Sequence, residues 1–108
     1  MKSYTKIYLD SFGYEIDDPT AFIPCETCGQ KGVDVAHIKA LGMGGSKLRN
    51  NIENIQMLCR KCHIEYGDKK QWMSYLYQKH MDFMLANGVK FDREWILGEI
   101  ERYEDFSE

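Results

Sequence analysis

Apolar and aromatic side chains recur at helical spacing toward both ends of the chain. Residues 69–86 form the longest such pattern, and Asn87-Gly88 directly after it predicts the end of that helix. Asp92 is suited to cap a last helix, whose apolar residues again fall on one face. The N-terminal segment predicts a short helix packed on the rest of the domain, through Tyr4, Ile7, Tyr8 and Phe12.

The middle of the chain has a different pattern. Residues 32–38 alternate apolar and polar side chains and include β-branched ones, so they predict a strand. The apolar run 55–58 leads into Cys59, and we expect a helix to begin within residues 59–67. We therefore predict a small α+β fold. A glycine-containing loop separates the strand from the apolar run, with Gly42, Gly44 and Gly45.

The chain has 108 residues, enough for one domain or for one small core with helical extensions. A core of this size gains stability from a metal ion that cross-links it. The sequence has no apolar run long enough to cross a bilayer, and acidic residues interrupt its first segment before any secretory pattern. We therefore expect a cytoplasmic protein with no membrane partner, in a compartment where thiols stay reduced.

Charge is unevenly distributed along the chain. The formal net charge is −3, which argues weakly against a nucleic-acid partner. Residues 30–70, however, carry a net charge of +4, between flanks 1–29 and 71–108 with net charges of −3 and −4. A positive middle segment can meet a phosphate backbone locally, although a solvated loop with incidental lysines would have the same charge.

The four cysteines form two pairs of identical spacing, "CETC" at 25–28 and "CRKC" at 59–62. Each pair can bring two thiolates to one ion, and together Cys25, Cys28, Cys59 and Cys62 complete a tetrahedral shell suited to Zn²⁺. Such a zinc is structural, because no position stays open for a substrate. Two redox-active disulfides, or four unconnected thiols, are the alternatives. His63 directly follows the second pair and is not needed for the zinc.

The stretch "CETCGQKGVDVAHIKALGMGGS", followed by "IENIQMLCRKCH", resembles an HNH endonuclease with a four-cysteine zinc, of the small type common in phages and mobile elements. The cysteine pairs, the His-Ile, the glycine loop, the Glu-Asn and the Cys-His fall in that family's order. The resemblance implies a ββα-metal (His-Me finger) core with structural zinc at residues 25–68. Residues 1–24 are then an N-terminal extension, and residues 69–108 a C-terminal helical region packed on the core.

The resemblance also implies roles for three side chains. His37 matches the family's general base, and His63 matches a ligand of the catalytic ion, Mg²⁺ or another divalent metal. Asn54 matches the asparagine whose amide ties the loop and helps to orient the base. These roles suit the chemistry, because phosphodiester hydrolysis needs a base for water and a cation for the developing charge. Taken singly, each would ordinarily be a hydrogen-bonded or exposed residue.

One position departs from the family's pattern. Most relatives carry Asp or His immediately before the base, where it helps to hold the catalytic ion, but this chain has Ala36. Asp34 is the tentative replacement ligand. Strand alternation places Asp34 and Ala36 on one face and His37 on the other, although the twist at a strand end can change this.

We therefore expect a DNA endonuclease of low sequence specificity, because contacts to the DNA backbone position a protein without reading bases. The alternative, motivated by Ala36, is a catalytically impaired zinc-stabilised module that binds DNA or protein. A homodimer is one arrangement that the sequence allows. The side chains expected to contact the DNA backbone are Lys39, Lys47, Arg49, Arg60 and Lys61.

Overall fold

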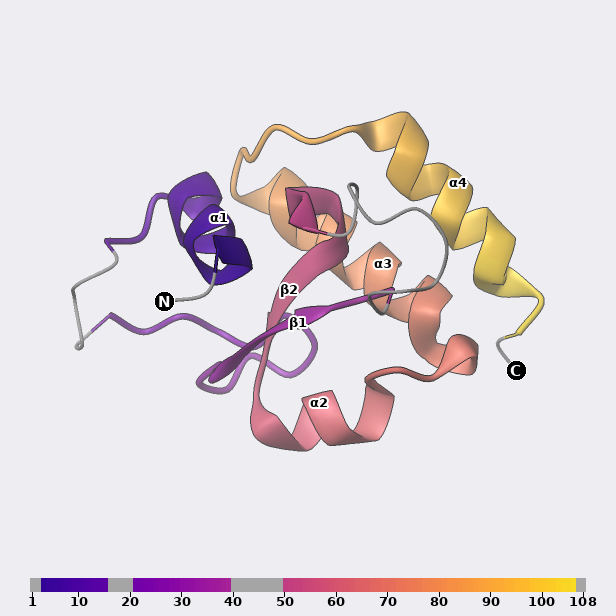
Figure 1. Ribbon diagram of the computed structural model, residues 1–108, viewed down its shortest axis with the longest axis horizontal. Helices are drawn as coiled ribbons and strands as arrows, with labels where there is room; N and C mark the ends of the chain where they lie inside the picture. Colours follow the sequence, from indigo (N-terminus) through magenta and orange to yellow (C-terminus); the bar gives the residue numbers. More distant parts are fainter. Residues whose placement is uncertain (1–2, 16–20, 40–49, 107–108) are drawn as a thin grey trace.

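The computed structural model describes residues 3–15, 21–39 and 50–106. A two-stranded antiparallel sheet lies among the helices, which confirms the predicted α+β fold (Figure 1). None of the helices in these ranges is both long and apolar enough to cross a membrane. In chain order the elements are α1 (Ser3–Phe12), β1 (Asp34–His37), the 3-10 helix η2 (Ile52–Asn54), β2 (Ile55–Leu58), α2 (Arg60–Tyr66), α3 (Lys70–Ala86) and α4 (Arg93–Glu104).

Helix α1 forms where the spacing predicted it, because it buries the side chains of Tyr8 and Leu9. Tyr8 packs against Ile55 and Met57 of β2 and is fully buried. Gly13 follows the helix with a φ of +77°, a left-handed conformation that glycine adopts at little cost at a helix end. The N-terminal segment is therefore packed on the sheet.

The sheet is a hairpin in which His37 lies opposite Ile55. Successive side chains point to opposite faces, so Val35 joins the cluster under α1 while Ala36 packs near the cysteines. Strand β2 is buried along its whole length, because side chains cover both of its faces. The predicted glycine loop, with Gly42, Gly44 and Gly45, lies outside the described residues.

The first cysteine pair lies in a tight turn before β1. The backbone N–H of Cys25 donates to the carbonyl of Gln30 at 2.6 Å, and Gly29 has a φ of +80°. A Cβ on Gly32 would lie 2.2 Å from Cγ of Met57, so a glycine there lets the turn pass close to β2. The turn is thereby fixed against the sheet.

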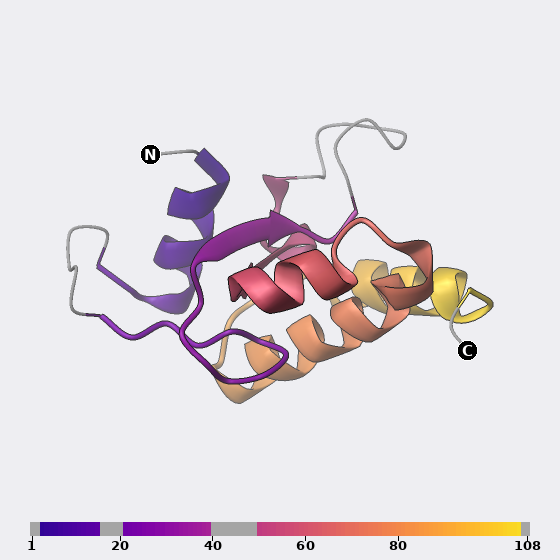
Figure 2. The same ribbon diagram turned by 90° about the horizontal axis from the view of Figure 1, so that it is seen from below.

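Helices α3 and α4 form the largest apolar cluster, and Figure 2 shows them side by side. Leu76 and Tyr77 of α3 pack with Ile96 of α4, while Tyr66 of α2 lies against the same cluster. Helix α3 therefore contacts both the core and the last helix, which explains its excess of apolar residues. The predicted cap of α4 is present: Oδ1 of Asp92 accepts a hydrogen bond from the backbone N–H of the third helical residue at 3.1 Å.

Candidate functional site

The four cysteines meet between the first turn and the start of α2. Their Sγ atoms all lie within 4.8 Å of one another, and those of Cys28 and Cys59 are 3.7 Å apart. Four sulfurs in a tetrahedron, each about 2.3 Å from a zinc ion, would be about 3.8 Å apart. All four thiols are free of disulfide bonds. The four cysteines are therefore placed to hold one metal ion, and their sulfur donors suit Zn²⁺.

The surroundings of these thiols shift the pKa values of Cys25 and Cys62 in opposite directions. Burial works to raise the pKa of Cys25, but hydrogen bonds from Thr27 and from the backbone outweigh it and bring the pKa to about 6. For Cys62, burial and the neighbouring thiols raise the pKa to about 12. Thiolates packed this closely repel one another, and a metal ion at their centre removes that repulsion.

His63 lies on α2, next to Cys62. Its Nδ1 is 3.1 Å from Oδ2 of Asp34 on β1. Arg60 donates two hydrogen bonds to the same carboxylate, from Nε to Oδ2 at 2.9 Å and from Nη2 to Oδ1 at 3.1 Å. Partial burial works to raise the pKa of Asp34, but the hydrogen bonds from His63 and Arg60 outweigh it and hold this pKa below its usual value. An ionised carboxylate thus holds the Nδ1 side of the His63 ring.

Two surface hollows share His63. A Cβ on Gly67 would lie 2.9 Å from Cδ2 of the His63 ring, so a glycine there lets the chain turn close to the imidazole. The larger hollow, of about 480 Å³, is lined by Asp34, Arg60, His63, Ile64, Gly67 and Asp68. The smaller, of about 280 Å³, is lined by Tyr4, Thr5, Val33, Asp34, Val35 and His63. The imidazole is accessible, since 38% of its side chain is exposed.

His37 ends β1 and has two neighbours that hold its ring. Its Nε2 is 2.9 Å from Oδ1 of Asn50, and its ring centroid is 4.5 Å from that of Tyr4, with the planes at 61°. With Oδ1 of Asn50 as acceptor, Nε2 carries the proton and Nδ1 keeps its lone pair. His37 and His63 do not contact each other in the part of the chain that the structure describes, but Tyr4 borders both the His37 ring and the smaller hollow.

Asn54 is buried and fastens the chain directly after β1. Its Oδ1 accepts hydrogen bonds from the backbone N–H of Lys39 at 2.9 Å and from the hydroxyl of Tyr77 at 2.6 Å. Its Nδ2 donates to the Lys39 carbonyl at 3.0 Å, and its backbone carbonyl accepts from the N–H of Ile38 at 2.8 Å. Asn54 therefore fastens the backbone that directly follows His37, whereas the side chains that contact the His37 ring are those of Asn50 and Tyr4.

The side chains expected to bind phosphate differ in their surroundings. The ammonium of Lys39 lies 2.7 Å from Oε2 of Glu99 and 5.2 Å from the centre of the Tyr103 ring, and this lysine is only 9% exposed. The amine of Lys39 is thus held in a buried ion pair, which argues against the expected contact with the DNA backbone. Arg60 keeps 71% of its side chain exposed, and Lys61 is exposed as well. Lys47 and Arg49 lie outside the described residues.

A buried polar network joins the first cysteine turn to the helices on either side. Glu26 accepts hydrogen bonds from the Tyr8 hydroxyl at 2.6 Å, Nε2 of Gln56 at 3.1 Å and Nδ1 of His80 at 2.8 Å. Nε2 of His80 faces the carbonyl oxygen of Ile52, so both ring nitrogens have acceptors. Glu26 and His80 therefore form a buried, hydrogen-bonded pair whose side chains are both fully enclosed.

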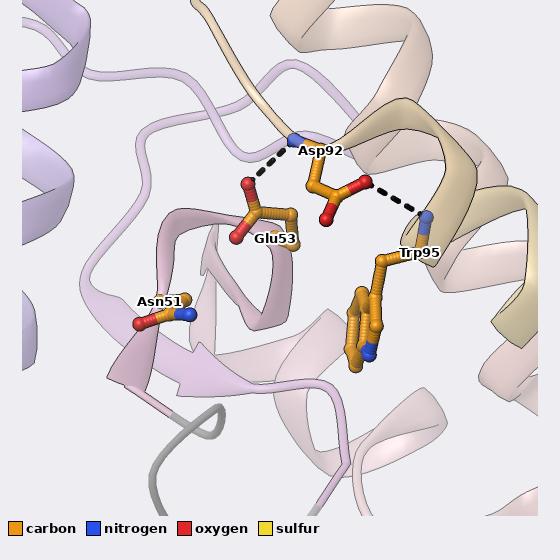
Figure 3. A pocket seen from close by; sticks show the side chains of 4 residues that line it. All are labelled: Asn51, Glu53, Asp92 and Trp95. Atoms are coloured by element: carbon orange, nitrogen blue, oxygen red, sulfur yellow. Dashed lines mark hydrogen bonds between the residues drawn. The ribbon is translucent and has the colours of Figure 1, made fainter.

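A third hollow, of about 170 Å³, lies at the start of α4 and is drawn in Figure 3. Its two carboxylates both accept from backbone groups. Oε2 of Glu53 accepts from the N–H of Asp92 at 2.7 Å, and Asp92 in turn caps α4 at Trp95 (Figure 3). The hydrogen bond from Asp92 to Glu53 thus ties the start of α4 to η2. Both acidic side chains of the hollow therefore already have structural partners.

Comparison with known protein families finds a match to HNH endonuclease over residues 25–69. A search of the curated proteins and a search of the solved structures find no match. The matched segment contains both cysteine pairs together with His37, Asn54 and His63, and the cysteines converge as the four-cysteine form of the fold requires. Residues 25–69 of this chain are therefore similar to the HNH endonuclease family.

Proposed function

We propose that the protein is a metal-dependent endonuclease that hydrolyses DNA phosphodiester bonds. The observation that carries the proposal is the hydrogen bond from Nδ1 of His63 to Asp34, at the surface beside the four-cysteine centre. Histidines that bind metals usually donate their other ring N–H to a carboxylate, which fixes the ring and its tautomer. Nε2 of His63 then remains for a divalent ion.

Mg²⁺ or a similar ion bound at His63 would stabilise the negative charge that develops on the phosphoryl and leaving oxygens. Both oxygens of Asp34 accept hydrogen bonds from Arg60 or His63, so we propose that Asp34 orients His63 and is not itself a ligand. In the described part of the chain, only the four cysteines form a metal-ligating group of three or more side chains. With His63 as its one proposed protein ligand, the divalent ion would complete its coordination with water and phosphate oxygens.

His37 is the proposed general base. Asn50 holds the proton on Nε2, and Nδ1 can take a proton from the attacking water. Asn54 secures the backbone of Ile38 and Lys39 next to that ring, which limits the movement of the base. Orientation of this kind lowers the barrier, because little ordering remains for the transition state.

DNA is the proposed substrate because positive side chains gather in the matched segment. Arg60 and Lys61 are exposed on α2 at the His63 hollow or next to it. Contacts from these side chains to phosphates would hold DNA without reading its sequence, so low sequence specificity is expected. Lys47 and Arg49 remain proposed DNA contacts because of their place in the positively charged segment. Lys39 is not proposed as a DNA contact, because its amine is paired with Glu99.

The second candidate is a zinc-stabilised module that binds DNA or protein without cutting. The observation that favours it is Ala36, only 6% exposed and packed with Cys25, Leu58 and Cys62. The position that holds a metal ligand in most relatives is thus filled by a buried methyl group. Under this alternative, the zinc-loaded protein binds DNA and leaves it intact with every divalent ion.

The experiment is nicking of supercoiled plasmid by zinc-loaded protein over a titration of Mg²⁺ or Mn²⁺. Wild type is compared with His63→Ala and with Ile64→Ala, a neighbouring exposed residue on α2. We expect His63→Ala to require a much higher ion concentration and to cut at least about 100-fold more slowly, a typical loss for a metal-holding or acid–base group. Equal metal dependence of wild type and His63→Ala would refute the assignment of the ion to His63.

A further inference from the structure

We propose that Tyr4 of α1 is a positioning residue for His37, and that α1 lines one side of the smaller hollow at His63. The proposal rests on the nuclease function above, because it gives Tyr4 a task in that reaction. Helix α1 lies outside the segment 25–69 that matches the HNH family, so the match assigns nothing to Tyr4.

The contact between the two rings is close and directional. Their centroids are 4.5 Å apart and their planes meet at 61°, within the edge-to-face range that aromatic rings prefer. Asn50 holds His37 at Nε2, and Tyr4 restrains the plane of the imidazole. Two restraints of different kinds therefore set the direction in which the lone pair of Nδ1 points.

Tyr4 can restrain His37 only if its helix is itself fixed. Tyr8, one turn further along α1, is fully buried and donates a hydrogen bond from its hydroxyl to Glu26 at 2.6 Å. Its ring packs with Ile55 and Met57 of β2, and Tyr4 packs against the same cluster. The helix is thus anchored one turn from the contact with His37.

The same tyrosine also reaches the metal side of the proposed site. Tyr4 and Thr5 line the hollow of about 280 Å³ that includes Asp34 and His63. Tyr4 thereby borders both imidazoles, although His37 and His63 occupy different elements. A DNA strand that approaches His63 from this side would pass along α1.

The test compares Tyr4→Leu and Tyr4→Met, which remove the ring, with Tyr4→Phe, which keeps it. Two ring-deleting variants are made so that the result does not depend on the folding of one. Ile7→Ala is the matched control, because Ile7 packs against the same cluster from the same helix. Zinc-loaded proteins are compared by kcat and KM for plasmid nicking, by Tm, and by NMR of the histidine rings. The chain has three histidines, so His63 and His80 serve as internal references.

We expect Tyr4→Leu and Tyr4→Met to lower kcat by about 10- to 100-fold with little change in KM, the loss expected for a misplaced catalytic group. Their His37 ring signals should shift, whereas those of Tyr4→Phe and Ile7→Ala stay near wild type. Unchanged His37 signals without the Tyr4 ring, unchanged kcat in both ring-deleting variants, or an equal loss of kcat in Ile7→Ala would overturn the proposal. If wild type cuts no DNA at all, the nuclease proposal fails, and the NMR comparison still decides whether Tyr4 holds His37.

Discussion

Glu26 and His80 lie fifty-four positions apart in the sequence, yet their side chains are 2.8 Å apart and wholly buried. Glu26 stands between the first two cysteines, and His80 lies within α3. Tyr8 of α1 donates to the same carboxylate. One buried hydrogen-bonded pair therefore connects the cysteine cluster to helices on both sides of the matched segment.

Loss of one partner from this pair should cost much stability. We expect His80→Leu to lower the free energy of unfolding by about 1–3 kcal/mol, because it removes a hydrogen-bond partner of the buried Glu26 side chain. Gln78→Ala, on the same helix, is the control. It removes an exposed hydrogen bond to Asp82 and should change stability by at most about 0.5 kcal/mol. Urea unfolding of the zinc-loaded proteins measures both, and a loss below about 1 kcal/mol in His80→Leu would contradict a stabilising role for this buried hydrogen bond.

The metal centre predicts one zinc per chain, measurable by elemental analysis of the purified protein. Removal with a chelator should lower Tm by about 10 °C or more, because the binding energy of a structural zinc contributes to folding. Cys28→Ser and Cys62→Ser separate ligation from packing, since Cys28 is exposed and Cys62 is buried. Ligation predicts a large loss of Tm for both variants. If only Cys62→Ser lowers the Tm, the loss reflects the packing of a buried side chain, and the four cysteines do not bind a metal together.

Lys39 and Lys61 should differ in their effects on DNA binding. Lys39→Ala breaks the ion pair with Glu99, so we expect it to lower stability and leave the salt dependence of DNA affinity unchanged. Lys61→Ala should weaken binding on all sequences and reduce the slope of log affinity against log salt by about 1. Fluorescence anisotropy measures the DNA affinity of each variant at several salt concentrations, at a temperature below its Tm. A reduced slope for Lys39→Ala would show that its amine reaches DNA.

Ala36→Asp introduces a carboxylate directly before His37, the proposed base. Because Ala36 is packed against Cys62 and Leu58, we expect the carboxylate to lower Tm by about 10 °C or more and not to increase cleavage. Val33→Asp is the control, since Val33 is 55% exposed just before the same strand and should change Tm little. If Ala36→Asp instead keeps its Tm and cuts much faster than wild type, the wild-type chain is an impaired nuclease.

Local features of the sequence predicted most of the fold. The spacing of apolar residues placed α1, α3 and α4, because each helix buries one side against the core. The cysteine spacing predicted a shared metal centre, since a short turn brings two thiols to one ion. The homodimer, the phage origin and the division at residues 24 and 68 stay predictions from the sequence.

The polar partners could not be predicted, because they are distant in sequence. His80 follows Leu76 at helical spacing, so the sequence predicts only that it lies on the buried face of the helix. Nothing near it in the sequence indicates that Glu26 is its hydrogen-bond partner. Lys39 was expected on the surface from its charge alone, but Glu99, sixty positions later, buries it. Asn50 and Tyr4 lie on either side of His37 only after the chain has folded. For Tyr4, the one local signal was its place on the apolar face of a helix.

The most direct test is nicking of supercoiled plasmid by zinc-loaded wild type and by a folded His37→Ala variant, in Mg²⁺ or Mn²⁺. A gel-shift assay first establishes that both proteins bind the DNA equally. We predict that wild type nicks the plasmid and that His37→Ala does so at least about 100-fold more slowly, the contribution typical of a general base. Equal rates in the two proteins would contradict the role of His37, and DNA bound but uncut by zinc-loaded wild type would contradict the nuclease itself.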